Sequence, residues 1–125
     1  MAKDKNQAIK WLPDVEDHDY LDAESYLRLI FDDKRVGRMM TELRNAAIVK
    51  FKAKDIFRAS QLSLLGVSNS HVERDRKKIQ RDVRLSPLLL VRNDSIGRVV
   101  IADGYHRLCA IYEFDENASI HCKLI

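Results

Sequence analysis

The chain of 125 residues has few cysteines and no long hydrophobic run. Its 2 cysteines, Cys109 and Cys122, lie inside apolar segments and lack the spacing of metal ligands, so two free, buried thiols are expected. No apolar run approaches the roughly 20 residues that cross a bilayer, which argues against a membrane protein. Residues 1–20 also lack the apolar core of a signal peptide. These absences predict a cytoplasmic protein.

A strong excess of charge of one sign is also lacking, since the net charge is +3. This balance is too weak to indicate a DNA-binding protein. The charges are nevertheless uneven: residues 1–24 hold 3 basic and 7 acidic residues, whereas residues 52–84 hold 9 basic and 4 acidic residues. The basic segment suits an anionic ligand. Lys77 and Lys78 are its best candidates for contacts with a polyanion, although a solvated helix face is the commoner explanation.

Two common kinds of metal site are not expected. Residues 14–24 have the acidic density of a metal-binding loop but lack the spacing of a Ca²⁺ loop, so they are interpreted as a solvated cap rich in helix-start residues. The 4 histidines show no i, i+4 pair, which argues against a zinc site. They are His18, His71, His106 and His121.

The first third of the chain is predicted to be helical. Asp22 is a good N-cap for a helix over residues 22–33, where apolar side chains recur at helical spacing. A second amphipathic helix is predicted over residues 34–47, which Gly37 weakens slightly. The short connection indicates a helical hairpin that covers one side of the core. Residues 1–46 are therefore predicted to form an acidic segment and two helices that pack on the core.

The remaining residues, 47–125, are predicted to form a mixed unit of strands and helices. Asp55 is expected to cap a short helical turn that ends near Gly66, and Ser70 and Glu73 form the S-x-x-E pattern of a capping box. The predicted elements are a strand within 47–56, a helical turn over 56–65, a helix over 68–83, strands over 88–92 and 98–103, a helix over 104–114 and a strand over 118–125. This order predicts an α/β (α+β) fold with a small mixed sheet and flanking helices.

One stretch, VVIADGYHRLCAIY at residues 99–112, joins a strand end to a helix start with several reactive side chains. A helix N-terminus presents unpaired N–H groups and about half a positive charge, and Gly104 lets another group approach the backbone. Arg107 adds a forked donor for phosphate oxygens, and His106 can donate a hydrogen bond or transfer a proton near neutral pH. Asp103 has three open roles: capping the helix, orienting His106 or helping to hold a metal ion. Ordinary turn chemistry remains the alternative.

The same stretch resembles the core motif of the ParB/sulfiredoxin superfamily, in which a strand leads into a G-x-x-R turn and a helix. The motif is Gly104 to Arg107 here, followed by Ala110, and its GYHR form is closer to the sulfiredoxin G-C-H-R than to the ParB G-E-R-R. Upstream, Arg58, His71 and Pro87 resemble an arginine after the first core strand, a basic residue opening the next helix and a proline-led strand. The resemblance covers residues 47–125.

The resemblance implies a nucleoside triphosphate, usually with Mg²⁺, bound at the G-x-x-R turn. Carried over by position, the backbone from Gly104 through Tyr105 would cradle phosphate, while His106 and Arg107 would contact its oxygens. Arg58 and His71 would approach from the facing side.

Tyr105 departs from both relatives, because its position carries the sulfiredoxin cysteine or the ParB glutamate. A phenol with a pKa of about 10 cannot replace a thiolate, so sulfiredoxin activity is not expected. The helix-turn-helix region that follows this domain in ParB proteins is also missing from the sequence, so specific DNA binding is not expected.

Three functions follow from these observations. The leading interpretation is a ParB/sulfiredoxin-like domain that binds a nucleotide or another phosphorylated small molecule at Gly104–Arg107. The first alternative is a Mg²⁺-dependent phosphotransferase or nucleotide hydrolase, with Asp103 or His106 as the base or a metal-side ligand. The second alternative is a non-catalytic interaction module whose N-terminal helices pair with another protein or form a homodimer.

Overall fold

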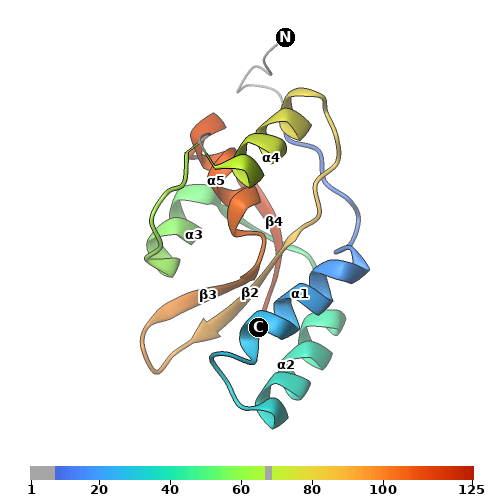
Figure 1. Cartoon of the computed structure of the whole chain (residues 1–125), viewed down its shortest axis with the longest axis vertical. Coiled ribbons are helices and arrows are strands. Elements are labelled where there is room, and N and C mark those ends of the chain that lie inside the picture. The colour runs from blue at the N-terminus through green and yellow to red at the C-terminus, as the bar shows by residue number, and fades with distance from the viewer. Residues whose placement is uncertain (1–7, 67–68) are drawn as a thin grey trace.

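The computed structural model describes residues 8–66 and 69–125 (Figure 1). The predicted α+β class, with a mixed sheet and flanking helices, is confirmed over these ranges. Residues 1–7 of the predicted N-terminal segment, and Ser68 at the predicted start of the third helix, lie outside them. The helices are α1 (Asp17–Leu27), α2 (Asp33–Asn45), α3 (Ala53–Ser60), α4 (Ser70–Gln80) and α5 (Tyr105–Phe114), and the strands are β1 (Val49–Lys52), β2 (Leu88–Asn93), β3 (Arg98–Asp103) and β4 (Ser119–Leu124).

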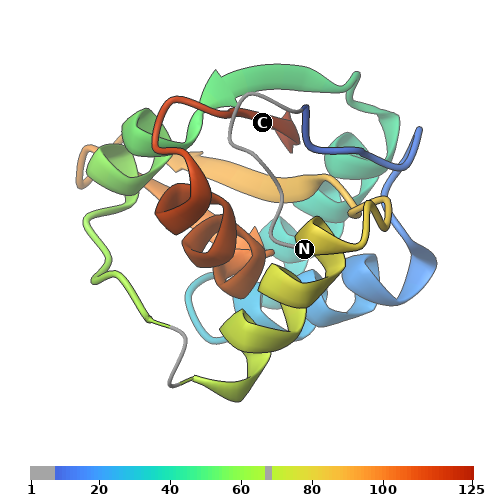
Figure 2. The same ribbon diagram turned by 90° about the horizontal axis from the view of Figure 1, so that it is seen from above.

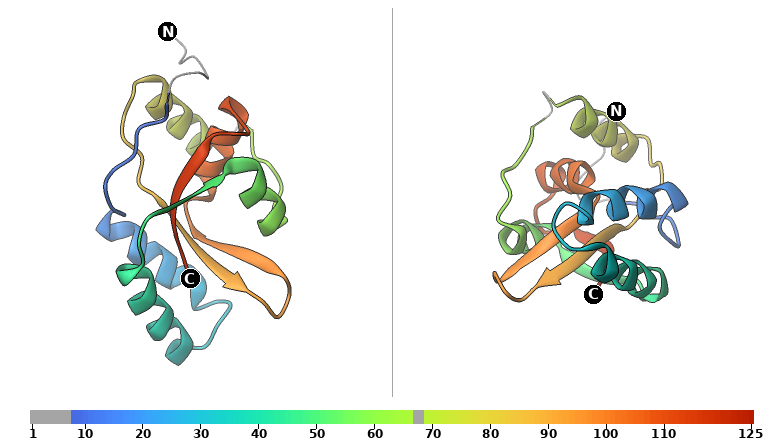
Figure 3. Two further views of the ribbon diagram at one scale, coloured as in Figure 1. Left: turned by 180° about the vertical axis from the view of Figure 1, so that it is seen from behind. Right: turned by 60° about the horizontal axis from the view of Figure 1, so that its bottom comes forward.

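The four strands form one mixed sheet in the order β1-β4-β2-β3 (Figure 3). Its central strands, β2 and β4, run parallel, whereas the outer pairs β1–β4 and β2–β3 are antiparallel. A hairpin turn joins β2 to β3, and Gly97 adopts a positive φ of 65° there. Helix α5 then crosses from the edge strand β3 to the central strand β4, and the start of this crossover holds the G-x-x-R motif.

Strand β2 shows how helices cover both faces of the sheet. Successive side chains of a strand point to opposite faces. Leu88 and Leu90 pack in the core formed with α3, α4 and α5, whereas Leu89 and Val91 pack in the core formed with α1 and α2. All four side chains are buried. The sheet is therefore a middle layer, and the predicted N-terminal helical pair covers one of its faces (Figure 2).

A buried lysine ties the last strand to the N-terminal part of the chain. Lys123 on β4 lies with its Nζ 2.8 Å from the Tyr20 hydroxyl, 3.0 Å from the Arg44 carbonyl oxygen and 3.1 Å from Asp14 Oδ1. Burial lowers the pKa of Lys123, but its hydrogen bonds to Tyr20 and Asp14 outweigh that effect and raise it. The three donors of the ammonium group thus meet three acceptors.

The cysteines behave as predicted, since both are free and buried. Burial raises the pKa of Cys122 to about 11, so this thiol is protonated at neutral pH and is a poor nucleophile. Within the two described ranges, no helix has the length and apolar character that crossing a membrane requires.

The predicted start of the first helix is wrong. Helix α1 begins at Asp17, so Asp22 lies inside the helix rather than at its N-cap, and the helix ends at Leu27. Tyr20 and Ala23 are both buried in the core beneath α1. Because residues three apart share one helix face, this packing extends the helix back by more than a turn. Local cap propensity at Asp22 is overridden by tertiary contacts.

The predicted capping box of the third helix is also wrong. The N-cap of α4 is Asn69, whose side chain accepts hydrogen bonds from the backbone N–H groups of His71 and Val72 at 2.9 and 3.2 Å. Glu73, which the box would bend back toward the helix start, instead forms an ion pair with Arg76 at 2.8 Å. An asparagine cap is as favourable as a serine cap, and the helix begins at Ser70, one residue earlier than a Ser70 cap would place it.

Helices α3 and α4 also end earlier than predicted. Helix α3 begins before Asp55 and stops at Ser60, because the next residue, Gln61, adopts the left-handed conformation with φ 58°. Helix α4 stops at Gln80, so Val83 leaves the expected apolar stripe and is exposed.

Candidate functional site

A polar cleft lies between α1, α4 and the start of α5. Its volume is about 250 Å³. It combines residues from the predicted motif with residues far from it in sequence. The lining consists of Glu16, His18, Asp19, Asp22, Arg74, Asp75, Lys78, Arg84, Leu85, Ser86, Asp103, Gly104, His106 and Arg107.

Gly104 forms the turn between β3 and α5, with a φ of 106° that strongly favours glycine. A Cβ atom there would lie 2.5 Å from Leu88 Cγ and 2.9 Å from Arg107 Nη2. Glycine at this position therefore makes room for the side chains of Leu88 and Arg107, and not only for a ligand. Residues Gly104 to Arg107 still present a helix start without a side-chain cap, because no side chain in residues 8–66 and 69–125 bonds to the first N–H groups of α5.

Arg107 is held inside the protein by two carboxylates. Its Nη2 donates to Asp103 Oδ2 at 3.1 Å and to Asp19 Oδ2 at 3.4 Å, and its side chain is 16% exposed. Its Nε is buried and has no hydrogen-bond partner in the part of the chain that the structure describes. The guanidinium charge is thus largely neutralised by the protein, which leaves it less available to phosphate than the sequence suggested.

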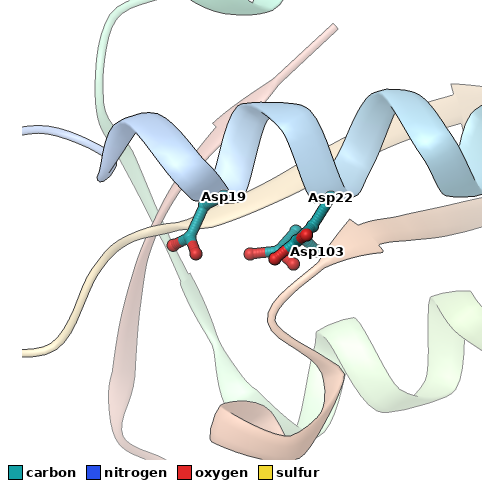
Figure 4. Close-up of side chains that lie close together, drawn as sticks. All are labelled: Asp19, Asp22 and Asp103. Carbon is teal, nitrogen blue, oxygen red and sulfur yellow. The ribbon is translucent and has the colours of Figure 1, made fainter.

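The two carboxylates that bind this guanidinium lie close to a third, that of Asp22 (Figure 4). Asp19 and Asp22 come from α1 and Asp103 from the end of β3, and one oxygen of each lies within 4.8 Å of the others. Asp19 is only 3% exposed, which corrects the prediction that residues 14–24 are a solvated cap. Burial raises the pKa of Asp103 to about 6, Arg107 opposes this shift, and the neighbouring charge of Asp19 adds to it.

The opposite wall of the cleft is basic. Arg74 and Lys78 of α4, with Arg84 beyond it, are exposed, and none forms an ion pair with a carboxylate within 4.0 Å in residues 8–66 and 69–125. Arg74 Nη2 lies 3.1 Å from His71 Nδ1. Between these cations sits Asp75, which is 4% exposed. Burial raises the pKa of Asp75 although the charges of Arg107, Lys78 and Arg74 lower it.

The histidines of the predicted site lie next to each other. His106 lines the cleft, and its ring centroid is 4.9 Å from that of His71, which is exposed at the start of α4. Burial lowers the pKa of His106, and His71 lowers it further. His106 is therefore neutral at pH 7, as a proton acceptor must be.

Three predicted site residues do not line the cleft, and one of them, His71, lies beside it. Tyr105 packs against the core on the side of α3, and its hydroxyl donates a hydrogen bond to the Ser63 carbonyl oxygen. Arg58 is exposed on α3 and is absent from the lining. The structure thus brings together Asp103, Gly104, His106 and Arg107, with His71 beside them.

Sequence reasoning missed Asp19, Asp22 and Asp75 as members of the site. Asp19 and Asp22 are three residues apart and so share a face of α1, and Asp75 shares a face of α4 with Lys78. This spacing is a visible signal. However, it does not tell which face meets Arg107, because that contact joins residues 88 positions apart.

No family model, no curated protein and no solved structure matches the chain. The resemblance to the ParB/sulfiredoxin superfamily therefore stays a prediction from the motif, and function is argued from the cleft itself.

Proposed function

We propose that the protein binds a phosphorylated small molecule, such as a nucleotide, in the cleft between α1, α4 and the start of α5. The observation that carries this proposal is the basic wall, where Arg74, Lys78 and Arg84 face one cleft and none forms an ion pair with a carboxylate within 4.0 Å in the described ranges. Like charges that converge repel each other, and an anion in the cleft relieves this repulsion. Phosphate oxygens accept strong hydrogen bonds from such cations.

The start of α5 supports the same ligand. Its first N–H groups lack a side-chain cap, and Gly104 and His106 line the cleft at this end. The N-terminus of a helix favours negative charge, so a phosphate bound between the start of α5 and the basic wall is stabilised by both.

Arg107 has a different role in this proposal from the one that the sequence suggested. Its Nη2 is already shared by Asp19 and Asp103. We assign Arg107 the role of holding the carboxylates of Asp19 and Asp103 in place, while Lys78 and its neighbours on α4 contact phosphate.

The first experiment is a thermal-shift panel of nucleotides, sugar phosphates and inorganic phosphate, each with and without Mg²⁺. A ligand at 100 times its Kd stabilises the fold by about 2.7 kcal/mol, so a true ligand raises Tm measurably. The absence of a shift with every compound at millimolar concentration contradicts the proposal.

The ligand found is then tested on two matched variants of α4. Lys77 and Lys78 are both exposed, but only Lys78 lines the cleft. Lys78→Ala should weaken the affinity about tenfold, or about 1.4 kcal/mol, while Lys77→Ala should change it less than about twofold. Equal losses in the two variants would indicate a diffuse charge effect and contradict a phosphate contact in the cleft.

Turnover of the ligand is a second candidate function. It is favoured by His106, a neutral imidazole that lines the same cleft as Asp103. Phosphate release with Mg²⁺ should then be lost in His106→Ala and kept in His121→Ala, because His121 lies outside the cleft.

Two other predictions stay untested. The surface beside the N-terminal helices leaves Leu21 and Leu29 exposed by 60% and 85%, but nothing identifies a second copy as their partner. The predicted cytoplasmic location is likewise a hypothesis.

A further inference from the structure

We infer that the open edge of strand β1 binds an extended peptide segment in which apolar and acidic residues alternate. This surface is separate from the proposed function, because no residue of β1 lines the cleft. Strand β1 forms one edge of the sheet, with β4 as its neighbour (Figure 3). All four of its residues are exposed, whereas each of β2, β3 and β4 has buried residues.

The backbone of β1 offers hydrogen-bonding groups on its outer side. The N–H of Ala53, which follows β1 directly, donates to the Ala118 carbonyl oxygen at 3.0 Å and continues the register of β1 with β4. In an antiparallel pair, residues that bond to the partner strand alternate with residues whose N–H and C=O groups point away from it. Lys50 therefore turns its N–H and C=O away from β4, and Lys52 turns its N–H away. An added strand can pair with these groups.

An apolar pocket of about 220 Å³ lies on the face of the sheet that α3 covers. Phe51 of β1 contributes to its lining together with Ile56 of α3 and Leu90 of β2. Phe51 is 41% exposed, and Val49, two residues earlier and so on the same face of β1, is 39% exposed. A strand added beside β1 would place every second side chain next to this apolar surface. Apolar side chains are favoured at those positions, because they cover Val49 and Phe51.

The opposite face of β1 is basic. Lys50 and Lys52 are exposed, and neither forms an ion pair within 4.0 Å in the part of the chain that the structure describes. Burial lowers the pKa of His121, the β4 partner of Lys50, and the charge of Lys50 lowers it further. The pocket, in contrast, is lined by one residue of each charge, Asp55 and Arg92. Acidic side chains are therefore favoured on the lysine face of the added strand and apolar ones on its pocket face.

The two lysines also argue against a second copy of the chain as the occupant. The outward backbone groups of β1 belong to Lys50 and Lys52, so two copies that paired through this edge would set these lysines directly opposite one another. Like charges in directly opposite positions destabilise a strand pair, and lysines on an edge strand discourage self-association. A glutamate or aspartate opposite each lysine replaces that repulsion with attraction.

The test is a titration of the whole chain with a short capped peptide in which leucine and glutamate alternate, followed by amide NMR spectroscopy. We expect saturable shifts at the amides of Lys50 and Lys52. The same peptide with N-methyl groups on its pairing amides keeps its side chains but cannot donate to β1, so its affinity should fall about tenfold or more. A peptide with serine in place of leucine should also bind about tenfold more weakly, because it leaves the apolar face uncovered.

Two lysine variants of the protein test the charge. Lys50→Glu should weaken binding of the leucine–glutamate peptide about tenfold or more, because it places like charges opposite one another. Lys77→Glu changes the net charge by the same amount at an exposed position of α4, and it should weaken binding less than about twofold. Both positions are exposed, so thermal melting should show that both variants keep the wild-type fold.

Three results of the titrations overturn the inference: no saturable shift in β1 up to about 5 mM peptide, equal affinity for the N-methylated peptide, or equal weakening in the two lysine variants. The N-methylated peptide keeps the test independent of the variants, since it uses the wild-type chain. Shifts of the β1 amides that depend on protein concentration without any peptide would identify a second copy as the occupant and overturn the inference as well.

Discussion

Two cations, the buried Lys123 and the half-buried Arg107, connect the N-terminal part of the chain to the sheet, and they are satisfied to different degrees. Lys123 has its three donors matched by Tyr20, Arg44 and Asp14. Arg107 shares its Nη2 between two carboxylates that lie close to a third, and its Nε has no hydrogen-bond partner among the described residues.

The difference separates a structural contact from a candidate site. Every group around Lys123 has its partner within the protein, so a ligand has nothing to add there. The cluster around Arg107 opens into a cleft and keeps more acidic than basic charge. Perturbed and incompletely paired charges of this kind gather at functional sites, because a ligand completes them.

Removal of the guanidinium should have the largest effect. Arg107→Met leaves the buried carboxylate of Asp19 and the half-buried carboxylate of Asp103 without their cation, which should lower the free energy of unfolding by about 3 kcal/mol. Urea denaturation at pH 7 measures this loss. Added Mn²⁺ should restore part of it, because a divalent cation replaces the missing charge. A variant as stable as the wild type would show that the cluster does not need its cation.

Removal of the ammonium group should have a smaller effect. Lys123→Met leaves the Tyr20 hydroxyl and the Arg44 carbonyl oxygen without a donor, whereas Asp14 is exposed enough to be solvated. We expect a loss of about 2 kcal/mol in the same urea experiment. Mn²⁺ should not restore it, because no second carboxylate stands in this network. Equal rescue of both variants by Mn²⁺ would erase the distinction between the two clusters.

The smallest effect should be a pH dependence from Asp103. Its pKa is about 6 in the folded protein, above the value of 3.8 for an unperturbed aspartate, so the folded state binds this proton more tightly. Protonation of Asp103 therefore stabilises the fold below about pH 4, and this contribution is lost as the pH rises through 6. After allowance for solvent screening it amounts to about 1 kcal/mol. Asp103→Asn should flatten the stability profile between pH 4 and 6, and an unchanged slope would contradict the pKa shift.

The local parts of the fold were predictable from sequence. The strand over residues 98–103 and the helix that follows it agree with the structure, because the alternation of Val and Ile and the Asp103–Gly104 turn are local signals. The run of leucines in β2 predicts a buried strand for the same reason. Such signals do not depend on which distant segment packs against them.

The rest of the site depends on contacts that no local pattern contains. Asp22 looked like a helix cap, and only the packing of α1 on the sheet shows it to be a cleft residue. Tyr105 looked like part of the phosphate cradle, yet its backbone position directs the ring toward Ser63, in the segment that follows α3. Direction around a helix axis decides both cases, and tertiary packing sets that direction.

The order of the strands has a consequence for synthesis of the chain. Strand β1 is linked to the β2–β3 hairpin only through β4, which follows both in sequence and lies between them in the sheet. We expect the two halves of the sheet to remain apart on the ribosome until residues 119–124 have left the exit tunnel. Until β4 follows, the edge of β2 that β4 later covers stays open, and an open strand edge is prone to pairing with other chains.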